Sequence, residues 1–304
     1  ALSLSKLVKY YFSIYESLVL KKGIPQYKFP EFSDYIEQLS SREIQKNITF
    51  WSHHLKESER IKPLNILHGV DYKPIHLINP TKHSNLNISR ETTNTLKNIS
   101  RSLNVSLNTT LQMLWAVLLQ KSSNENDILF GVISCGRFSA EIHHNSIGMF
   151  INTIPVRVKS NKLDTFSSLV QKQQKFSHRA FMYENFPFNK VKGLSNQLDH
   201  LLIFHDEEIL EPLNNSRELD DIGINIGNFE IIDKPAYSLN ITFKIMEEIN
   251  IEFLYDPSIF IERRMLNLLK MFDRIIKIII ENPDVRISEI DIDVEKFYIK
   301  AKSH

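Results

Sequence analysis

Cysteine is almost missing from this sequence, since Cys135 is the only one among 304 residues. One cysteine excludes a disulfide within the chain and a zinc site built on several cysteines. Such usage is typical of proteins kept in a reducing compartment, so we expect a cytoplasmic protein.

Long apolar runs and an excess of charge of one sign are lacking as well. No run approaches the roughly 18 residues that a membrane-spanning helix needs. The 37 basic and 36 acidic side chains nearly balance and leave a net charge of +1. We therefore expect neither a membrane nor a nucleic acid as partner.

Glycine is scarce, yet three of the eight glycines fall in one region: Gly131, Gly136 and Gly148. Glycine permits positive φ and close backbone approach, which predicts a tight passage there. Residues 146–157 read as an extended segment in which Asn152-Thr153 interrupts an apolar run. A buried amide left unpaired costs about 1–3 kcal/mol. We therefore expect Asn152 to bond neighbouring backbone or to face a polar cavity.

The rest of the composition is that of a globular protein, with 42% hydrophobic and 24% charged residues. A chain of this length favours two lobes over one. Its first part is predicted helical. From Ser3 to Leu20 the apolar residues follow i, i+3, i+4 spacing and form one broad buried stripe: Leu4, Leu7, Val8, Tyr11, Phe12, Tyr15 and Leu18. Gly23 and Pro25 end this helix.

A second helix is predicted from a cap at Ser33 to about Glu59, with a break near Ser40-Ser41. Residues 62–80 connect it to alternating helices and strands, which predict an α/β fold. Residues 207–228 are polar and are predicted to form a mobile loop. Helices are expected after caps at Ser89, Ser106 and Asp164, and from Ser258 to Glu281; strands are expected at 86–88, 128–134, 201–204, from 229, at 239–243 and at 251–255; an exit strand or tail is expected at 284–293.

Four groups of side chains could carry chemistry. His53-His54 lies on a predicted helix, where neighbours point about 100° apart, so the pair does not share one metal ion. His143-His144 has no acidic partner at a useful spacing, and His205-Asp206-Glu207-Glu208 is more typical of a polar loop than of a metal site. Cys135 could be a nucleophile, but no base is evident. The residues by themselves therefore predict no reaction.

One region carries a resemblance to a known family. Ser134-Cys135-Gly136-Arg137, followed by the sequence Ile-Gly-Met-Phe-Ile-Asn-Thr-Ile-Pro-Val-Arg at 147–157, resembles the S-G-R … I-G-x-F-[IV]-N-T-x-P-x-R signature of condensation domains from nonribosomal peptide synthetases. Supporting matches follow the family's order: Phe32-Ser33-Asp34-Tyr35 with Trp51 resembles Y-x-D-Y-x-x-W, residues 183–188 resemble H-x-D-x-P-F-E, residues 199–204 resemble F-D-x-x-[VI]-F, and Tyr255-Asp256 stands where Tyr-Asn is common.

The resemblance implies a two-lobed, V-shaped domain built from α/β lobes like that of chloramphenicol acetyltransferase. Residues 1–28 would be the last helix and exit of the N-terminal lobe. Residues 29–304 would be the C-terminal lobe, with a lobe-crossing segment near 134–157. The motif H-H-x-x-x-D-G, whose second His orients or deprotonates the acceptor amine, is absent from the sequence. It precedes a helix like that at Ser3 to Leu20 in the family, so we expect the chain to begin just after it.

The chemistry that the resemblance implies is amide-bond formation between two carrier-bound acyl or aminoacyl thioesters. The phosphopantetheine arms of donor and acceptor carrier domains would present the substrates, with no metal or cofactor bound directly. Further partners would be the N-terminal lobe and the adenylation domain of the same synthetase. Two alternatives stay open: a carrier-docking module without catalysis, and an epimerization domain of the same fold.

By resemblance the chain holds no catalytic residue, and its candidates for the substrate tunnel or lobe interface are Ser134, Cys135, Gly136, Arg137, Gly148, Asn152 and Thr153. Arg137 would contact a carrier domain or substrate, or form an ion pair that fixes its loop. Asn152 is expected to hold the crossing by hydrogen bonds rather than to contact substrate. Cys135 replaces the usual Ser, which favours a need for a small side chain over thiol chemistry. A lone C-terminal lobe should also expose the apolar face of its first helix and self-associate.

Overall fold

A mixed β-sheet organises the part of the chain that the computed structural model describes, which is residues 2–38, 41–58, 61, 81–137, 145–187, 190–191, 198–206 and 237–292. The sheet has six strands in the order β1-β6-β5-β4-β2-β3. Their bounds are β1 Lys82–Ile88, β2 Asp127–Ser134, β3 Asn152–Lys159, β4 His200–Asp206, β5 Leu239–Ile245 and β6 Ile249–Tyr255. The α/β fold expected from the sequence is therefore confirmed.

Strand direction changes across the sheet. β4 runs parallel to both β2 and β5, whereas the β2–β3, β5–β6 and β1–β6 pairs are antiparallel. β1 begins at Lys82, four residues before the predicted strand, because it pairs with β6 along its whole length. Two adjacent parallel pairs require crossover connections, which is why β4 enters the middle of the sheet rather than its edge.

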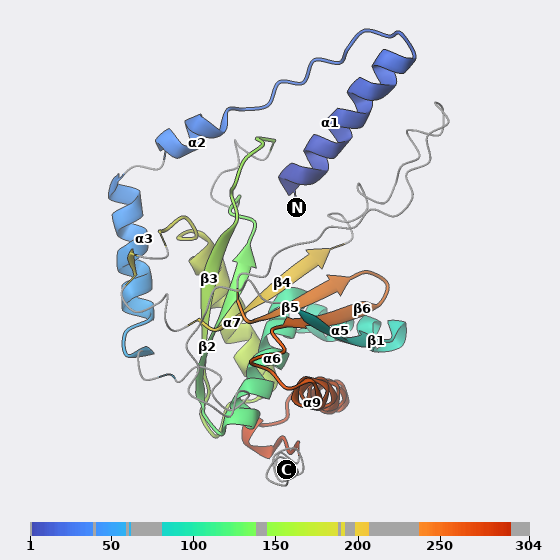
Figure 1. Ribbon diagram of the computed structural model, residues 1–304. Coiled ribbons are helices and arrows are strands. Elements are labelled where there is room, and N and C mark those ends of the chain that lie inside the picture. Colours follow the sequence, from blue (N-terminus) through green and yellow to red (C-terminus); the bar gives the residue numbers. More distant parts are fainter. Residues whose placement is uncertain are drawn as a thin grey trace.

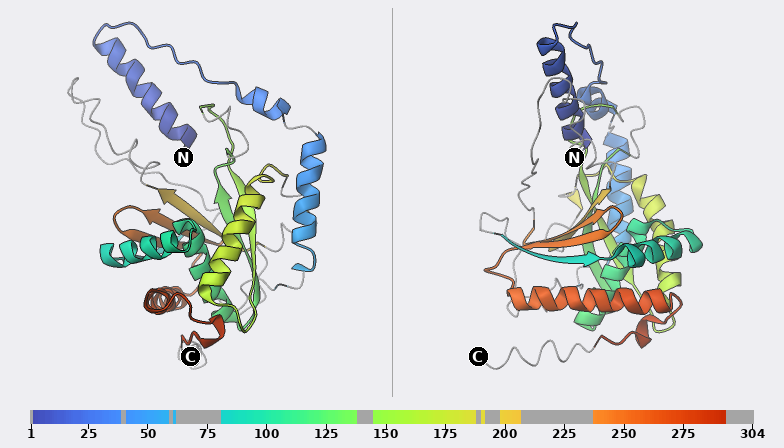
Figure 2. Two further views of the ribbon diagram at one scale, coloured as in Figure 1. Left: turned by 180° about the vertical axis from the view of Figure 1, so that it is seen from behind. Right: turned by 90° about the vertical axis from the view of Figure 1, so that its right-hand side faces the viewer.

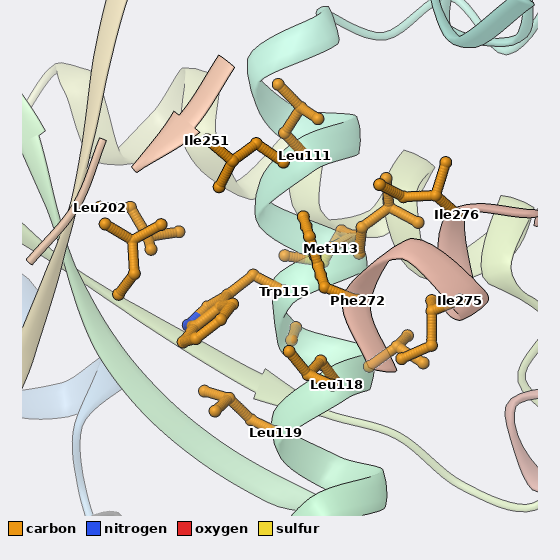
Figure 3. Packing of buried hydrophobic residues seen from close by; sticks show 14 of the residues in the cluster. Leu111, Met113, Trp115, Leu118, Leu119, Leu202, Ile251, Phe272, Ile275 and Ile276 are labelled. Atoms are coloured by element: carbon orange, nitrogen blue, oxygen red, sulfur yellow. The ribbon is translucent and has the colours of Figure 1, made fainter. Parts of the chain in front are cut away.

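Four long helices cover one side of this sheet: α5 Arg90–Ser102, α6 Leu107–Ser123, α7 Phe166–Phe181 and α9 Glu262–Glu281. α6 lies among the others (Figures 1 and 2) and is buried on almost every side from Thr109 to Gln120. A helix that is apolar all round needs such a central place. Figure 3 shows its side chains packed against α9 and the sheet: Leu111, Met113, Trp115, Leu118 and Leu119 face Phe272, Ile275, Ile276, Ile251 and Leu202.

A polar relay is buried at the start of β4. The Trp115 indole N–H donates to His200 Nε2 at 2.9 Å, and His200 Nδ1 lies 2.6 Å from Asp199 Oδ1. Because Nε2 accepts a hydrogen bond, His200 is the neutral tautomer that carries its proton on Nδ1 and donates it to Asp199. The relay thus satisfies three polar groups that the core would otherwise leave unpaired.

Helix starts agree with the sequence in part. Ser89 and Ser106 cap α5 and α6, accepting from the backbone N–H groups of Thr92 and Thr109. The predicted cap of α7 at Asp164 is wrong. Thr165 caps that helix through a reciprocal pair of bonds with Ser168, because Asp164 instead accepts from the Asn161 N–H within the preceding turn.

Other boundaries also moved. α2 Phe32–Gln38 starts before Ser33, so Ser33 is not its cap, and the predicted break separates it from α3 Ser41–His54. α9 starts at Glu262 rather than Ser258, because Ser258 belongs to a turn held by the Asp256 carboxylate. The predicted exit strand is mainly a 3₁₀ turn, η6 Ile287–Glu289, with one bridge from Arg286 to Thr165. The predicted connector at 62–80 and mobile loop at 207–228 lie outside the described residues.

α1 Leu2–Val19 and α2 stand apart from the sheet, joined by an extended segment that folds back on α1 (Figures 1 and 2). Tyr27 packs on Tyr10 with a ring-centroid distance of 4.8 Å. The apolar stripe of α1 is not buried as its spacing predicts, since Leu7 is 45% and Tyr11 63% exposed. No described helix combines the length and hydropathy that a membrane span requires.

Candidate functional site

The seven candidate residues come together at the end of the β2–β3 hairpin. Ser134 and Asn152 form the last pair of its register, and the chain beyond them extends past the sheet toward α1 and α2 (Figure 1). Cys135, Gly136 and Arg137 follow β2, while Gly148 precedes β3. The predicted extended segment at 146–157 is a strand only from Asn152 onward.

Two glycines allow the hairpin end to close on its surroundings. Gly136 has a φ of 67°, and a Cβ there would lie 1.6 Å from the Phe150 carbonyl oxygen. A Cβ at Gly148 would lie 2.3 Å from the Phe32 ring. Both positions therefore require glycine, one for its left-handed backbone and both for the space. The tight passage predicted from the sequence is confirmed.

Asn152 is bonded to backbone, which is one of the two outcomes its position predicts. Its Nδ2 donates to the carbonyl oxygens of Glu184 at 2.5 Å and Phe186 at 3.2 Å, and its Oδ1 accepts from the Thr153 N–H at 2.9 Å. The side chain thereby ties the start of β3 to the segment that follows α7. This is the contact expected of a residue that holds the crossing in place.

A buried carboxylate strengthens the same connection from β2. Ser134 Oγ donates to Glu184 Oε2 at 2.5 Å and accepts from the Gly136 N–H at 3.2 Å. Glu184 is fully buried, and a hydrogen bond to an ionised group is stronger than one between neutral groups. The turn after β2 and the segment after α7 are thus fixed to each other by both side chain and backbone.

α3 holds that segment from the other side. The Trp51 indole N–H donates to the Tyr183 carbonyl oxygen at 2.8 Å, and Asn47 Nδ2 donates to that of Asn185 at 2.6 Å. Trp51 is fully buried, and Phe50 stacks on Tyr183 with a centroid distance of 4.1 Å. Residues 183–186 are therefore clamped between α3 and the β2–β3 hairpin.

Arg137 is a buried cation, only 3% exposed. Its guanidinium donates to the Ser146 carbonyl oxygen at 3.0 Å and to Ser3 Oγ at 2.9 Å, and it lies 4.0 Å from the centre of the Phe150 ring. Burial lowers the pKa of Arg137 from its usual value. These contacts fix the loop, as one of the two predicted roles requires, and they use a ring and neutral oxygens.

An aromatic cluster surrounds the tip. Phe150 packs against Phe32 at 4.9 Å and Tyr35 at 4.7 Å between ring centroids. Burial, with a smaller contribution from the negative charge of Glu184, raises the pKa of Tyr35 to about 12. The Tyr35 hydroxyl therefore stays protonated near neutral pH. The neighbouring Met149 and Ile151 side chains point outward and are 79% and 51% exposed.

The other sequence candidates lie elsewhere. Burial raises the pKa of the Cys135 thiol, which opposes a thiolate nucleophile. His54 packs on Phe176 with a centroid distance of 4.0 Å. His143-His144 and Glu207-Glu208 fall outside the described residues. The part of the chain that the structure covers contains no group of three or more His, Cys, Asp and Glu side chains placed to hold a metal ion.

Sequence reasoning missed two members of the site. Glu184 stands at a variable position of the matched 183–188 motif, and Ser3 matches no quoted motif. Their partners lie 50 and 145 residues away in the sequence. The only available signal for Glu184 was an acidic residue inside an otherwise aromatic segment, and no signal in the sequence singled out Ser3.

Comparisons with known proteins point to one family. The model of the family described as "Condensation domain" matches residues 1–298. One of the plipastatin synthase proteins of Bacillus subtilis (strain 168) is 26% identical over 293 residues, which are 94% of this chain and 11% of that protein. Another plipastatin synthase protein of the same organism is 28% identical over 304 residues, 96% of this chain and 8% of that protein. The chain thus spans about a tenth of the length of these relatives.

Solved structures agree in fold. The first condensation domain of the calcium-dependent antibiotic synthetase, in complex with a substrate analogue, superposes with a TM-score of 0.71 and 13% identity over 96% of this chain and 64% of that one. A four-domain nonribosomal peptide synthetase bound to AMP and glycine gives a TM-score of 0.69 and 16% identity over 86% of this chain and 21% of that one.

Proposed function

This chain belongs to the condensation domain family, and from that premise we propose that it forms the second lobe of a two-lobed domain that makes amide bonds in a nonribosomal peptide synthetase. Residues 1–28 would be the last helix and exit of the first lobe, and residues 29–304 the second lobe. One observation carries the proposal: the β2–β3 hairpin leaves the sheet and is bonded to both α1 and the segment after α7. A segment that crosses between two lobes needs such fixed attachments at both of its ends.

The extent of the matches supports a partial domain. The chain covers nearly all of itself but only 64% of the solved condensation domain, and its described part has one sheet. The exposed stripe of α1 gives a first lobe an apolar surface to cover. These observations favour a second lobe over a complete two-lobed domain.

In the proposed reaction the amine of the acceptor attacks the thioester carbonyl of the donor. The C–N bond forms, the C–S bond breaks, the donor's pantetheine sulfur leaves as a thiol, and the amine loses one proton. The second His of H-H-x-x-x-D-G would orient or accept from that amine. That motif is not among the 304 residues, so this chain would shape the site while another segment of the synthetase supplies the base.

The partners follow from the same proposal. Donor and acceptor carrier domains would bring the two substrates on phosphopantetheine arms, and the first lobe and an adenylation domain would belong to the same synthetase. Within the chain, Ser134, Gly136, Gly148, Asn152 and Thr153 would fix the crossing segment. Cys135 would serve as a small residue in the turn, because its thiol is disfavoured as a thiolate.

The test is an assay with two loaded carrier proteins. One carrier holds an acyl group and the other an amino acid, and mass spectrometry of the acceptor arm detects the amide product. We expect product from the domain that includes the H-H-x-x-x-D-G segment and none from residues 1–304 alone. Product from residues 1–304 alone would show that the missing motif is not needed and would overturn the proposal.

The same assay separates the alternatives. Carrier binding without product from the whole domain would favour a docking module, and inversion of the donor's α-carbon without amide formation would favour an epimerization domain. The coding sequence upstream of Ala1 gives an independent check. An intact H-H-x-x-x-D-G directly before α1 would count against a stand-alone docking module.

A further inference from the structure

One serine in the first turn of α1 joins that helix to the β2–β3 hairpin. Ser3 Oγ donates to the Gly148 carbonyl oxygen at 2.8 Å, and it accepts from the Gly148 N–H at 3.2 Å and from Arg137 Nη2 at 2.9 Å. A hydroxyl has one proton and two lone pairs. All three are used here, so the geometry of Ser3 is fully determined by the hairpin.

The hairpin side of this contact is rigid. Arg137 is buried and is held at the same time by the Ser146 carbonyl oxygen and the Phe150 ring. Gly148 lies against the Phe32 ring so closely that no side chain fits there. Because neither partner has room to move, Ser3 meets a preformed receptor rather than an adjustable surface.

The rest of α1 is held much less. Lys6 adds one hydrogen bond to Asn145 at 3.3 Å, also near the start of the helix. Farther along, Tyr11 and Leu18 are 63% and 58% exposed, and the packing of Tyr10 is on the returning segment at Tyr27 and Phe29. The beginning of α1, and not its length, is therefore what the hairpin fixes.

We propose that Ser3 and Arg137 are a positioning pair that sets where the residues preceding α1 lie relative to the crossing hairpin. This inference rests on the proposed function, in which H-H-x-x-x-D-G precedes α1 and supplies the catalytic His. Neither residue touches the reacting atoms. Each acts through the backbone of α1 and of Gly148, so that a shift at Ser3 moves the His away from the hairpin that forms the opposite wall of the site.

This placement predicts how the kinetics respond. A displacement of about 1 Å at a reacting group can lower the rate about a hundredfold without weakening substrate binding. Ser3→Ala should therefore lower kcat of the whole domain by about ten- to a hundredfold and leave KM for the loaded acceptor carrier within about twofold. Arg137→Lys keeps the charge but cannot reach both oxygens from a planar fork, and should behave in the same way.

Matched variants separate this role from general destabilisation. Ser17→Ala removes a serine from the same helix whose hydroxyl bonds only to the Ser13 carbonyl oxygen within that helix, and it should leave kcat unchanged. Ser3→Thr retains the hydroxyl and should restore most of the lost rate. In the Ser3→Ala, Arg137→Lys double variant the losses should be less than additive, because both substitutions break one network.

Hydrogen exchange provides a readout that does not depend on activity. The Gly148 amide donates to Ser3 Oγ, so Ser3→Ala should raise exchange in the peptide covering residues 145–150, whereas Ser17→Ala should not. A whole domain that forms no amide from two loaded carriers would overturn the proposed function. A working domain in which Ser3→Ala leaves kcat or the exchange of residues 145–150 unchanged would overturn the positioning role.

Discussion

Replacing Asn152 by aspartate places a carboxyl group where the structure requires an amide donor. The Asn152 amide donates to two carbonyl oxygens, those of Glu184 and Phe186. Asn152→Asp keeps the shape of the side chain and removes both donated bonds. Asn152→Ala removes them without adding charge, so the two variants together isolate the effect of the new carboxylate.

The magnitudes follow from the partners. Leaving a buried acceptor unpaired costs about 1–3 kcal/mol, and this is the loss of unfolding free energy that we expect for Asn152→Ala. The new carboxylate would also lie near the Glu184 carboxylate, which Ser134 bonds from the neighbouring strand. Two like charges roughly 4–8 Å apart repel by about 2–4 kcal/mol at an effective dielectric constant of about 20. Asn152→Asp should therefore be the less stable variant at neutral pH.

The sign of the pH dependence follows from the same contacts. Repulsion and burial raise the pKa of the new carboxyl in the folded state above its unfolded value of about 3.9. The penalty is absent below that unfolded pKa, grows as the pH rises through the interval between the two values, and is complete above the folded pKa. Chemical denaturation from pH 4 to 8 should show the difference between Asn152→Asp and Asn152→Ala widening as the pH rises.

A control variant tests whether the location matters. Asn94 is exposed on α5, so Asn94→Asp should change stability by less than about 0.5 kcal/mol at any pH in this range. Parallel pH profiles for the aspartate and alanine variants at residue 152 would refute the reasoning, because they would mean that the new carboxyl is neither buried nor close to Glu184.

Three further predictions concern other parts of the molecule. Gly136→Ala should cost more than about 2 kcal/mol, because it combines a left-handed backbone with a blocked Cβ, whereas Gly23→Ala, which meets open space, should cost less than about 1 kcal/mol; thermal unfolding compares them, and equal melting temperatures would contradict the geometry. Burial lowers the pKa of His54 to about 4, so the folded state loses stability as the pH falls from about 6.5 to 4, and His54→Phe should reduce that loss in acid titrations followed by circular dichroism; an unchanged slope would assign it to other groups. Residues 1–304 should self-associate through the exposed stripe of α1, and Leu7→Lys should reduce the mass seen by light scattering more than the exposed-site control Glu37→Lys; a monodisperse wild-type monomer at high concentration would refute this.

Much of the fold could be predicted because its signals are local. Ser89 and Ser106 were identified as caps since each bonds an amide only three residues ahead. Asp164 was wrongly chosen because two capping residues stand side by side, and backbone geometry gave the role to Thr165. The length of β1 could not be read from its sequence, because its polar first half is a strand only by pairing with β6.

The candidate site divides in the same way. The sequence by itself determined that residues 134–157 are unusual, through clustered glycines, the Asn152-Thr153 pair and the family signature. Only the tertiary structure decided what satisfies those residues: Asn152 bonds to backbone 32 and 34 residues away, and Ser3 meets Gly148 across 145 residues. Such contacts depend on which distant segments the fold brings together, and no local pattern of residue types encodes that.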